Sequence, residues 1–292
     1  MALPIEVGER AISIGREGDV AIDDPRLSRH HVEVAFANGR WMIRDLESHN
    51  GTFTGGLLLR RAMEFAEGEL RVVRVGDTLL VPHPDLAAVA GGVAIETGIV
   101  VGAAFRECAR AIVAAGNRIH LVGERGSGKQ TAARHALDGD IEVIALDATP
   151  PSEDRQRELA KRDRLITISR IDPHVLAAAG ALVRELADQL GAIVTVPPLR
   201  ERPHELPHFA IAALATRSAK LAAHAGLIEQ VLARSWPGNA RELFAEVGEA
   251  AGIAIANKQD VVTAEHLAAT AGVTLSGMIT PVQPFDAPNP DE

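Results

Sequence analysis

The segment HLVGERGSGKQTAARHAL, residues 120–137, combines an apolar strand, a glycine-rich turn and a helix. Gly123, Gly128 and Lys129 fit the pattern G-x-x-x-x-G-K, and RIHLV and TAARHAL supply the strand and the helix that this pattern requires. In such a loop, backbone amides surround a phosphate at the helix N-terminus and the lysine reaches the outer phosphates. The segment therefore predicts a nucleotide-binding α/β domain with a mainly parallel sheet.

The composition is that of a globular protein. The chain has 292 residues, of which 47% are hydrophobic and 24% charged, and this length allows two ordinary domains. No segment has the apolar length of a signal peptide or a membrane span, so we expect a cytoplasmic protein without a membrane partner. Cys108 is the only cysteine, which excludes an intrachain disulfide and a multi-cysteine zinc site, and we assign no metal ligand. The net charge of −9 argues against a general electrostatic grip on nucleic acid.

The two halves of the chain differ in their hydrophobic pattern. Up to residue 82, short apolar runs such as AISIG, VEVAF and RVVRVG alternate with turn residues, which predicts an antiparallel β domain. Beyond it, alanine-rich helical stretches alternate with strand-like pieces such as IEVIALD and RLITIS, and from Leu206 we expect helices alone. We predict a β domain at 1–88, an α/β core at 95–205, a helical lid at 206–272 and a disordered tail at 273–292.

Polar motifs follow one another in the first half. The stretches SIGREGDVAIDDPRLSRHHVEV and WMIRDLESHNGTFTGG contain G-R, then S-x-x-H, then S-x-N-G-T. A phosphothreonine carries close to two negative charges, so its receptor needs a fixed guanidinium with hydroxyl and amide donors. Arg16, Ser28 and Arg29 offer such groups. Over residues 6–82 the motifs resemble the forkhead-associated (FHA) domain, a β-sandwich that binds phosphothreonine peptides.

The FHA resemblance implies roles for the matching residues. His31 is the histidine of S-x-x-H, which braces the loop in the family, so we assign it a structural role. Thr54 departs from the family, where many members have asparagine, and we expect an altered edge of the site. The implied phosphopeptide contacts, three on the phosphate and two in the second loop, are Arg16, Ser28, Arg29, His49 and Asn50.

Three stretches of the second half point to one family. GERGSGKQ, VPPLRERPHELP (196–207) and SWPGNARELFAEV (235–247) resemble sigma-54-dependent transcription activators, which are AAA+ ATPases, over residues 99–269. The resemblance implies ATP or ADP as cofactor. Gln130 stands where the usual phosphate loop has a magnesium-binding hydroxyl; the family also has a non-hydroxyl residue at this place, and we leave a Mg²⁺ ion unassigned. The implied nucleotide contacts, with the lid sensor arginine last, are Gly123, Glu124, Arg125, Gly126, Ser127, Gly128, Lys129, Gln130, Thr131 and Arg241.

Parts of the family's hydrolytic machinery are missing from the sequence. Neither the sigma-contacting G-A-F-T-G-A loop nor the G-T-L-F-L-D-E strand occurs between Lys129 and Pro197. Asp147 in VIALDA is the nearest imitation of the Walker B carboxylate, but it aligns with the family's preceding strand. Val183 and Gln189 stand where the arginine fingers belong. Hydrolysis needs these groups, so we name no catalytic residue and lean against an enzyme.

The sequence thus predicts a phosphothreonine-dependent regulator whose AAA+ module binds ATP without hydrolysing it. The expected partner is a protein phosphorylated by a Ser/Thr kinase, with the transcription machinery as a second candidate. No helix-turn-helix follows Ala271, so we expect no DNA-binding domain. The main alternative is an active ATPase of the sigma-54 activator class. A small P-loop kinase is disfavoured by PPLRERP and WPGNAREL, and the oligomeric state stays open.

Overall fold

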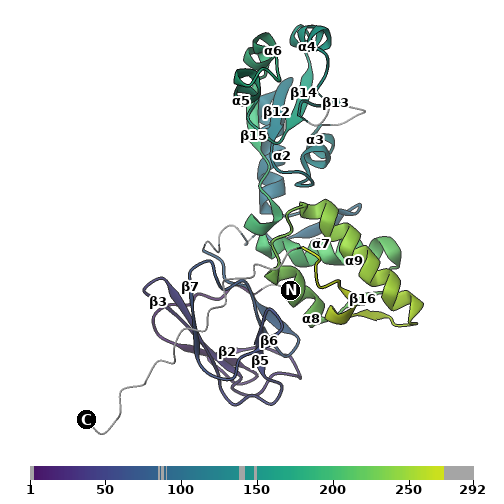
Figure 1. The fold of residues 1–292 in the computed structure, drawn as a ribbon. Coiled ribbons are helices and arrows are strands. Elements are labelled where there is room, and N and C mark those ends of the chain that lie inside the picture. Colours follow the sequence, from purple (N-terminus) through teal and green to yellow (C-terminus); the bar gives the residue numbers. More distant parts are fainter. Residues whose placement is uncertain are drawn as a thin grey trace.

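The computed structural model of the chain describes residues 3–84, 86, 89, 91–137, 142–147 and 150–272. These form a β-sandwich (12–80), an α/β unit (99–195) and a helical unit (206–272) that contacts both of the others (Figure 1). The predicted tail at 273–292 lies outside the described residues. Within the described part of the chain, no helix has both the length and the apolar character that a membrane span requires.

The β-sandwich consists of two sheets. The first has the strand order β2-β1-β3-β4-β7, from β1 (Ile12–Gly15), β2 (Val20–Ala21), β3 (Val32–Ala37), β4 (Arg40–Asp45) and β7 (Met63–Ala66). The second has the order β6-β5-β8-β9, from β5 (Thr52–Thr54), β6 (Leu57–Leu58), β8 (Val73–Val75) and β9 (Thr78–Leu80). Neighbouring strands are antiparallel except β1 and β2, so the predicted β-sandwich is confirmed.

Apolar side chains from both sheets fill the sandwich. Val32 and Val34 of β3 are buried while Glu33 between them is partly exposed, as the alternation of side chains along a strand requires. Ile43 and Val75 are almost completely buried and belong to the same core cluster. This core holds the ends of β1 and β5 in place, and the predicted phosphopeptide loops start or end there.

The α/β unit contains a parallel sheet of strand order β13-β14-β12-β15. The carboxyl ends of its strands meet at one edge, where the phosphate loop follows β12. This part confirms the predicted parallel α/β fold. Its elements are β11 (Ile99–Val101), which forms a hairpin with the preceding β10 (Ala94–Glu96), then α2 (Ala103–Ala115), β12 (Arg118–Val122), α3 (Lys129–Ala136), β13 (Val143–Ala145), α4 (Glu153–Ala160), β14 (Leu165–Ser169), α5 (Pro173–Ala178), α6 (Arg184–Gln189) and β15 (Ala192–Thr195).

The helical unit follows two 3-10 turns, η1 (Leu199–Glu201) and η2 (Pro203–Glu205). Its elements are α7 (Leu206–Arg217), β16 (Ala222–Ala223), α8 (Ala225–Ala233), α9 (Asn239–Ala256), β17 (Val261–Val262) and η3 (Ala264–His266). The expectation of helices alone is therefore wrong in one detail, because β16 and β17 form a short parallel pair. Trp236 is fully buried, and its indole Nε1 donates to the carbonyl of Val231 at 2.7 Å.

Candidate phosphopeptide and nucleotide sites

The first loop of the candidate phosphopeptide site depends on Gly15 at the end of β1. The amide of Arg16 donates to the carbonyl of Ser28 at 3.0 Å, and the amide of Glu17 donates to that of Arg29 at 2.8 Å. A Cβ atom on Gly15 would lie 2.2 Å from the Arg29 carbonyl oxygen, so only glycine permits this approach. The side chains of Arg16 and Arg29 are both exposed.

The second loop joins the first through side chains. The amide of His49 donates to Ser28 Oγ at 3.0 Å, and Asn50 Nδ2 donates to the carbonyl of Arg26 at 2.6 Å. His49 and Asn50 are both exposed. The structure therefore brings the predicted phosphopeptide residues of both loops together on one edge of the sandwich: Arg16, Ser28, Arg29, His49 and Asn50.

His31 is buried between the two loops with no exposed surface. Its Nδ1 accepts a hydrogen bond of 3.1 Å from the amide of Ser28. Because Nδ1 is an acceptor, the neutral ring carries its proton on Nε2, which lies 3.1 Å from the Gly51 carbonyl and donates to it. His31 thus braces both loops, in agreement with the structural role expected for it.

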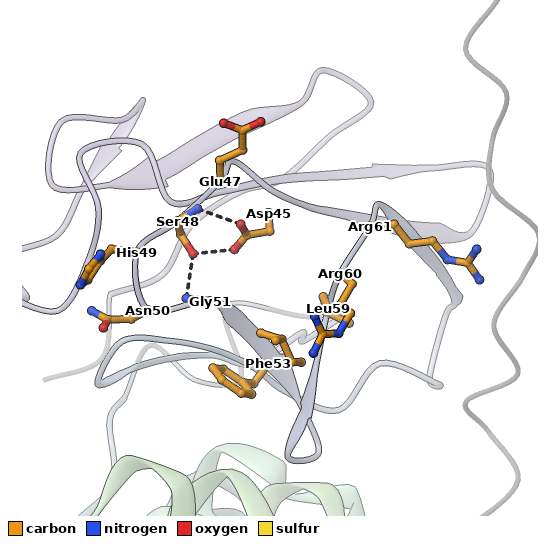
Figure 2. Close-up of a pocket in the computed structure, with 11 residues that line it drawn as sticks. Asp45, Glu47, Ser48, His49, Asn50, Gly51, Phe53, Leu59, Arg60 and Arg61 are labelled. Carbon is orange, nitrogen blue, oxygen red and sulfur yellow. Dashed lines mark hydrogen bonds between the residues drawn. The ribbon is translucent and has the colours of Figure 1, made fainter.

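A carboxylate organises the second loop from below. Asp45 accepts from the amide of Ser48 at 2.8 Å, from its hydroxyl at 2.7 Å and from the Thr52 hydroxyl at 2.5 Å. Burial acts to raise the pKa of Asp45, but hydrogen bonds from Thr52 and Ser48 outweigh it and hold the pKa below its ordinary value. Beside this turn lies a groove of about 460 Å³, whose lining includes Asn50, Phe53 and Leu59 (Figure 2).

The phosphate loop folds around its own lysine. Gly126 and Gly128 have φ of 77° and 100°, which side chains other than glycine rarely adopt, and α3 begins directly after them. Lys129 is only 8% exposed, and its Nζ donates to the carbonyls of Gly123 at 2.6 Å and Glu124 at 2.8 Å. Burial lowers the pKa of Lys129. The ammonium is therefore held at the centre of the loop.

Glu124 anchors the phosphate loop to the helical unit. It accepts from both terminal nitrogens of Arg200, at 2.8 and 2.6 Å, and this bonding lowers the pKa of Glu124. Asn239 Nδ2 donates to Glu124 at 3.1 Å and to the Arg125 carbonyl at 3.0 Å, while its Oδ1 accepts from the Leu199 amide at 2.8 Å. Arg200 and Asn239 lie in PPLRERP and WPGNAREL, but these motifs alone do not predict that both side chains bind Glu124.

Helix α9 also touches the loop through its backbone. The amide of Ala240 donates to the Gly126 carbonyl at 3.1 Å. A Cβ on Gly126 would lie 2.2 Å from the Gly238 carbonyl oxygen and 3.2 Å from Arg241 Cβ. Arg241 is exposed beside the loop, whereas Ser127 is buried, and its hydroxyl has no hydrogen-bond partner among the residues that the structure describes. The loop and the predicted sensor arginine are thus adjacent.

Gln130 and Thr131 are exposed on the first turn of α3. Asp147 follows β13 at the same edge of the sheet and accepts from the amide of Arg170 at 2.5 Å and from its Nε at 3.0 Å. Burial acts to raise the pKa of Asp147, but the bonds and charge of Arg170 keep the pKa below its ordinary value. The carboxylate that could imitate Walker B is therefore paired with a guanidinium, within electrostatic range of Lys129.

Comparison with known proteins yields one family match and several structural ones. Residues 12–79 match the model of the FHA domain. No curated protein matches the chain. The structure of Mycobacterium tuberculosis EmbR in complex with a low affinity phosphopeptide is 28% identical, with a TM-score of 0.22, and the match covers 26% of this chain and 21% of that one.

NtrX from Brucella abortus matches over more of the chain. One structure has a TM-score of 0.50 at 19% identity, covering 60% of this chain and 57% of NtrX. A second, in complex with ADP, has a TM-score of 0.48 at 19% identity, covering 63% and 58%. The chain thus spans little more than half the length of these structures. Residues 12–79 form an FHA domain, a phosphopeptide-binding class, and the parallel sheet with its helices has the fold of the AAA+ region of NtrX.

Proposed function

We propose that this protein is a phosphothreonine-dependent regulator that recognises a partner phosphorylated by a Ser/Thr kinase. The observation that carries the proposal is the convergence of Arg16, Ser28 and Arg29 on one exposed edge, with His31 buried beneath them. Two guanidinium groups and a hydroxyl match the charge and the acceptor oxygens of a phosphothreonine. Rigid loops favour binding because less conformational entropy is lost when the ligand is bound.

The hydrogen bonds of the free protein suggest how each group acts. Ser28 Oγ accepts from the His49 amide, which leaves its own proton free to point at a phosphate oxygen. The exposed guanidinium of Arg16 can offer two parallel N–H groups to the phosphate. Asn50 lies beside the groove, where its side-chain amide can exchange the Arg26 carbonyl for the backbone of a bound peptide.

The test is a binding titration of the full chain with peptides from a library that has a fixed phosphothreonine. Arg16→Ala should weaken binding at least about tenfold, because a charge-assisted hydrogen bond contributes roughly 1.5–3 kcal/mol. Arg44→Ala is the matched control, since Arg44 is an exposed arginine of the same sandwich that pairs with Glu33. Equal affinity for phosphorylated and unphosphorylated peptides would overturn the proposal.

We further propose that the AAA+ module binds ATP or ADP at the phosphate loop. Lys129 is held by two carbonyl oxygens, which phosphate oxygens can replace at little structural cost. The backbone amides of residues 125–130 and the exposed Arg241 supply the remaining positive potential. ADP should raise the melting temperature of the wild type but not of Lys129→Ala, while the exposed Lys161→Ala keeps the shift. A shift that persists in Lys129→Ala would place the nucleotide elsewhere.

We propose that bound ATP is not hydrolysed at a useful rate. Hydrolysis needs a held magnesium ion, a polarised water and a compensating cation from a neighbour. Val183 and Gln189 stand where the family has its arginine fingers, and the Asp147 carboxylate is engaged by Arg170. The position of Asp147 within electrostatic range of Lys129 is the one observation that favours the alternative, an active ATPase of the sigma-54 activator class.

A further inference from the structure

The β-sandwich packs through β8 and β9 on helix α8 of the helical unit. Val72, directly before β8, has no exposed surface. It belongs to the same apolar cluster as Leu227 and Val231 of α8. Leu79 of β9 packs against this cluster as well. The contact between the two units is therefore a continuous apolar core.

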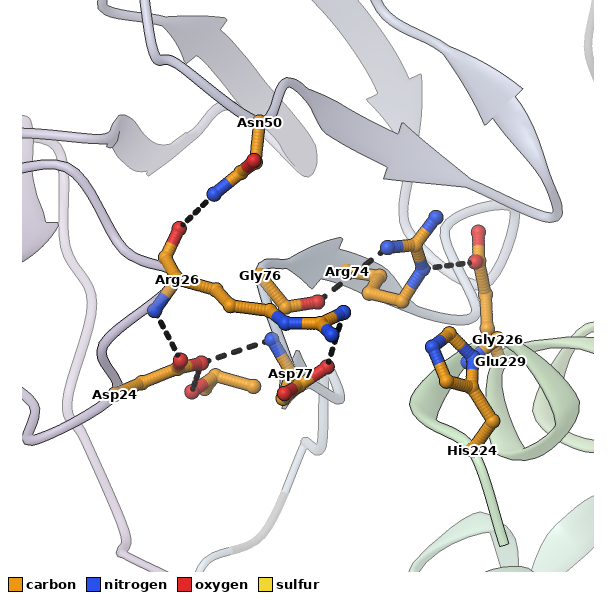
Figure 3. Close-up of polar contacts among 10 residues, drawn as sticks. Asp24, Arg26, Asn50, Arg74, Gly76, Asp77, His224, Gly226 and Glu229 are labelled. Carbon is orange, nitrogen blue, oxygen red and sulfur yellow. Dashed lines mark hydrogen bonds and ion pairs between the residues drawn. The ribbon is translucent and has the colours of Figure 1, made fainter. Parts of the chain in front are cut away.

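An ion pair is buried within this contact (Figure 3). Arg74 Nε donates to Glu229 Oε2 at 2.6 Å, and the amide of Gly56 donates to Glu229 Oε1 at 2.7 Å. The Glu229 side chain is 1% exposed and that of Arg74 is 17% exposed. A carboxylate removed from water in this way must stay paired. Because both of its oxygens are bonded, Glu229 fixes the position of Arg74.

Arg74 reaches the groove of the candidate phosphopeptide site through Phe53. The two residues are cross-strand partners in β8 and β5, and the guanidinium carbon lies 4.1 Å from the centroid of the Phe53 ring. Phe53 lines the groove together with His49 and Asn50 (Figure 2). A cation over an aromatic face attracts the ring. The ring that borders the groove is therefore held by a side chain that Glu229 positions.

A second connection runs through the turn after β8 (Figure 3). Asn50 donates to the Arg26 carbonyl at 2.6 Å, and the Arg26 side chain pairs with Asp77 at 3.3 Å. From the other side, Arg74 Nη1 donates to the Gly76 carbonyl at 3.3 Å. The turn is thus bonded both to the peptide loops and to the arginine that contacts the helical unit.

We propose that helix α8 completes the phosphopeptide site from behind. Glu229 is a positioning residue that fixes Arg74 and, through it, Phe53. The peptide residues that flank the phosphothreonine therefore reach their full affinity for the groove only when the helical unit is docked on the sandwich. This inference rests on the proposed phosphopeptide function. The phosphate itself meets Arg16 and Ser28. Within the described residues Arg74 bonds Glu229 and Gly76 and lies over Phe53, so we expect Glu229 to affect the flanking residues of the peptide and not the phosphate contact.

The experiment uses the full chain and two probes. One is the peptide that the wild type selects from a degenerate library with a central phosphothreonine, and the other is acetyl-phosphothreonine amide, which has no flanking residues. Glu229→Gln should bind the selected peptide roughly 2- to 30-fold more weakly, the range expected for residues that act through a neighbour. It should bind the small probe as the wild type does. Glu249→Gln, an exposed glutamate of α9, should change neither affinity.

A double-mutant cycle tests whether Glu229 acts through Arg74. Arg74→Gln should reproduce the selective loss, and adding Glu229→Gln to it should cause no further loss. Should Glu229→Gln not fold, Phe53→Leu removes the ring and keeps the ion pair, and it should weaken only the selected peptide. Wild-type affinity for the selected peptide in Glu229→Gln, or equal losses for both probes, would overturn the inference. If the wild type binds neither probe, the proposed function fails and the inference fails with it.

Discussion

The side-chain amide of Asn239 at the start of helix α9 donates a hydrogen bond of 3.1 Å to Glu124 in the phosphate loop. Asn239 is fully buried, its side chain makes three further bonds to backbone groups, and its φ is 54°. Asn239→Ala should therefore lower the free energy of unfolding by about 2–4 kcal/mol, because it leaves buried groups without partners and puts alanine in a left-handed conformation.

Denaturant unfolding checks this expectation, with Asn257→Ala as control. Asn257 lies at the other end of α9 and is exposed, so its replacement should change stability by no more than about 0.5 kcal/mol. Equal midpoints for Asn239→Ala and Asn257→Ala would show that the bond between loop and helix contributes nothing.

Two adjacent histidines should behave differently in the FHA domain. His31 is buried and bonds both peptide loops, whereas His30 is exposed. His31→Ala should destabilise the sandwich by about 1–3 kcal/mol, since the Ser28 amide loses its acceptor, and should also weaken phosphopeptide binding. His30→Ala should leave both quantities unchanged. If His31→Ala keeps the wild-type stability and phosphopeptide affinity, His31 does not brace the two loops.

ATP turnover by the purified chain should stay at the level of a no-protein control. In comparable P-loop enzymes an arginine finger raises the rate of hydrolysis roughly a thousandfold or more. This chain has Val183 and Gln189 at the corresponding positions, and its Asp147 is held by Arg170. Release of inorganic phosphate in the presence of Mg²⁺ is the measurement. Steady turnover that disappears in Lys129→Ala would restore the ATPase reading.

Stability should fall as the pH falls from about 6.5 to about 4. His120 is buried in β12 between the hydroxyls of Thr167 and Ser169, and burial lowers its pKa to about 4. Between these pH values the unfolded chain binds a proton at His120 that the folded chain does not, so the free energy of unfolding falls as the pH falls. The stabilisation is complete above the pKa of the unfolded state, and the free energy of unfolding decreases by up to about 1.4 kcal/mol per pH unit.

The variant His120→Gln isolates this contribution, because glutamine can bond the same hydroxyls without titrating. Denaturant unfolding across the pH range should give a flatter curve for the variant than for the wild type. His30→Gln, at an exposed position, should keep the wild-type slope. Parallel curves for His120→Gln and the wild type would contradict the lowered pKa.

Local motifs predicted much of the fold and of the two candidate sites. Short sequence motifs determine the conformation of the loops that carry Arg16, Ser28 and Asn50, and glycines determine that of the phosphate loop. The backbone conformation of these loops could therefore be predicted from residues close in sequence. Arg74 and Glu229 could not, because they lie 155 residues apart and neither belongs to a motif. In the sequence each looks like an ordinary surface charge.

Other misses have similar causes. Strands β16 and β17 contain two residues each, too few for any hydrophobic period to appear. Arg200 and Asn239 stand in quoted motifs, but only the folded chain shows that both bind Glu124. The four-part division of the chain stays a prediction.

The burial of Val72 among residues of the helical unit limits how this FHA domain can be moved or cut. In a fragment that ended at residue 84, Val72 and Leu79 would be exposed to solvent and Arg74 would lose its ion pair with Glu229. Exposed apolar surface of this kind promotes self-association. A recombination event that transferred this FHA domain to another protein would therefore have to transfer helix α8 with it.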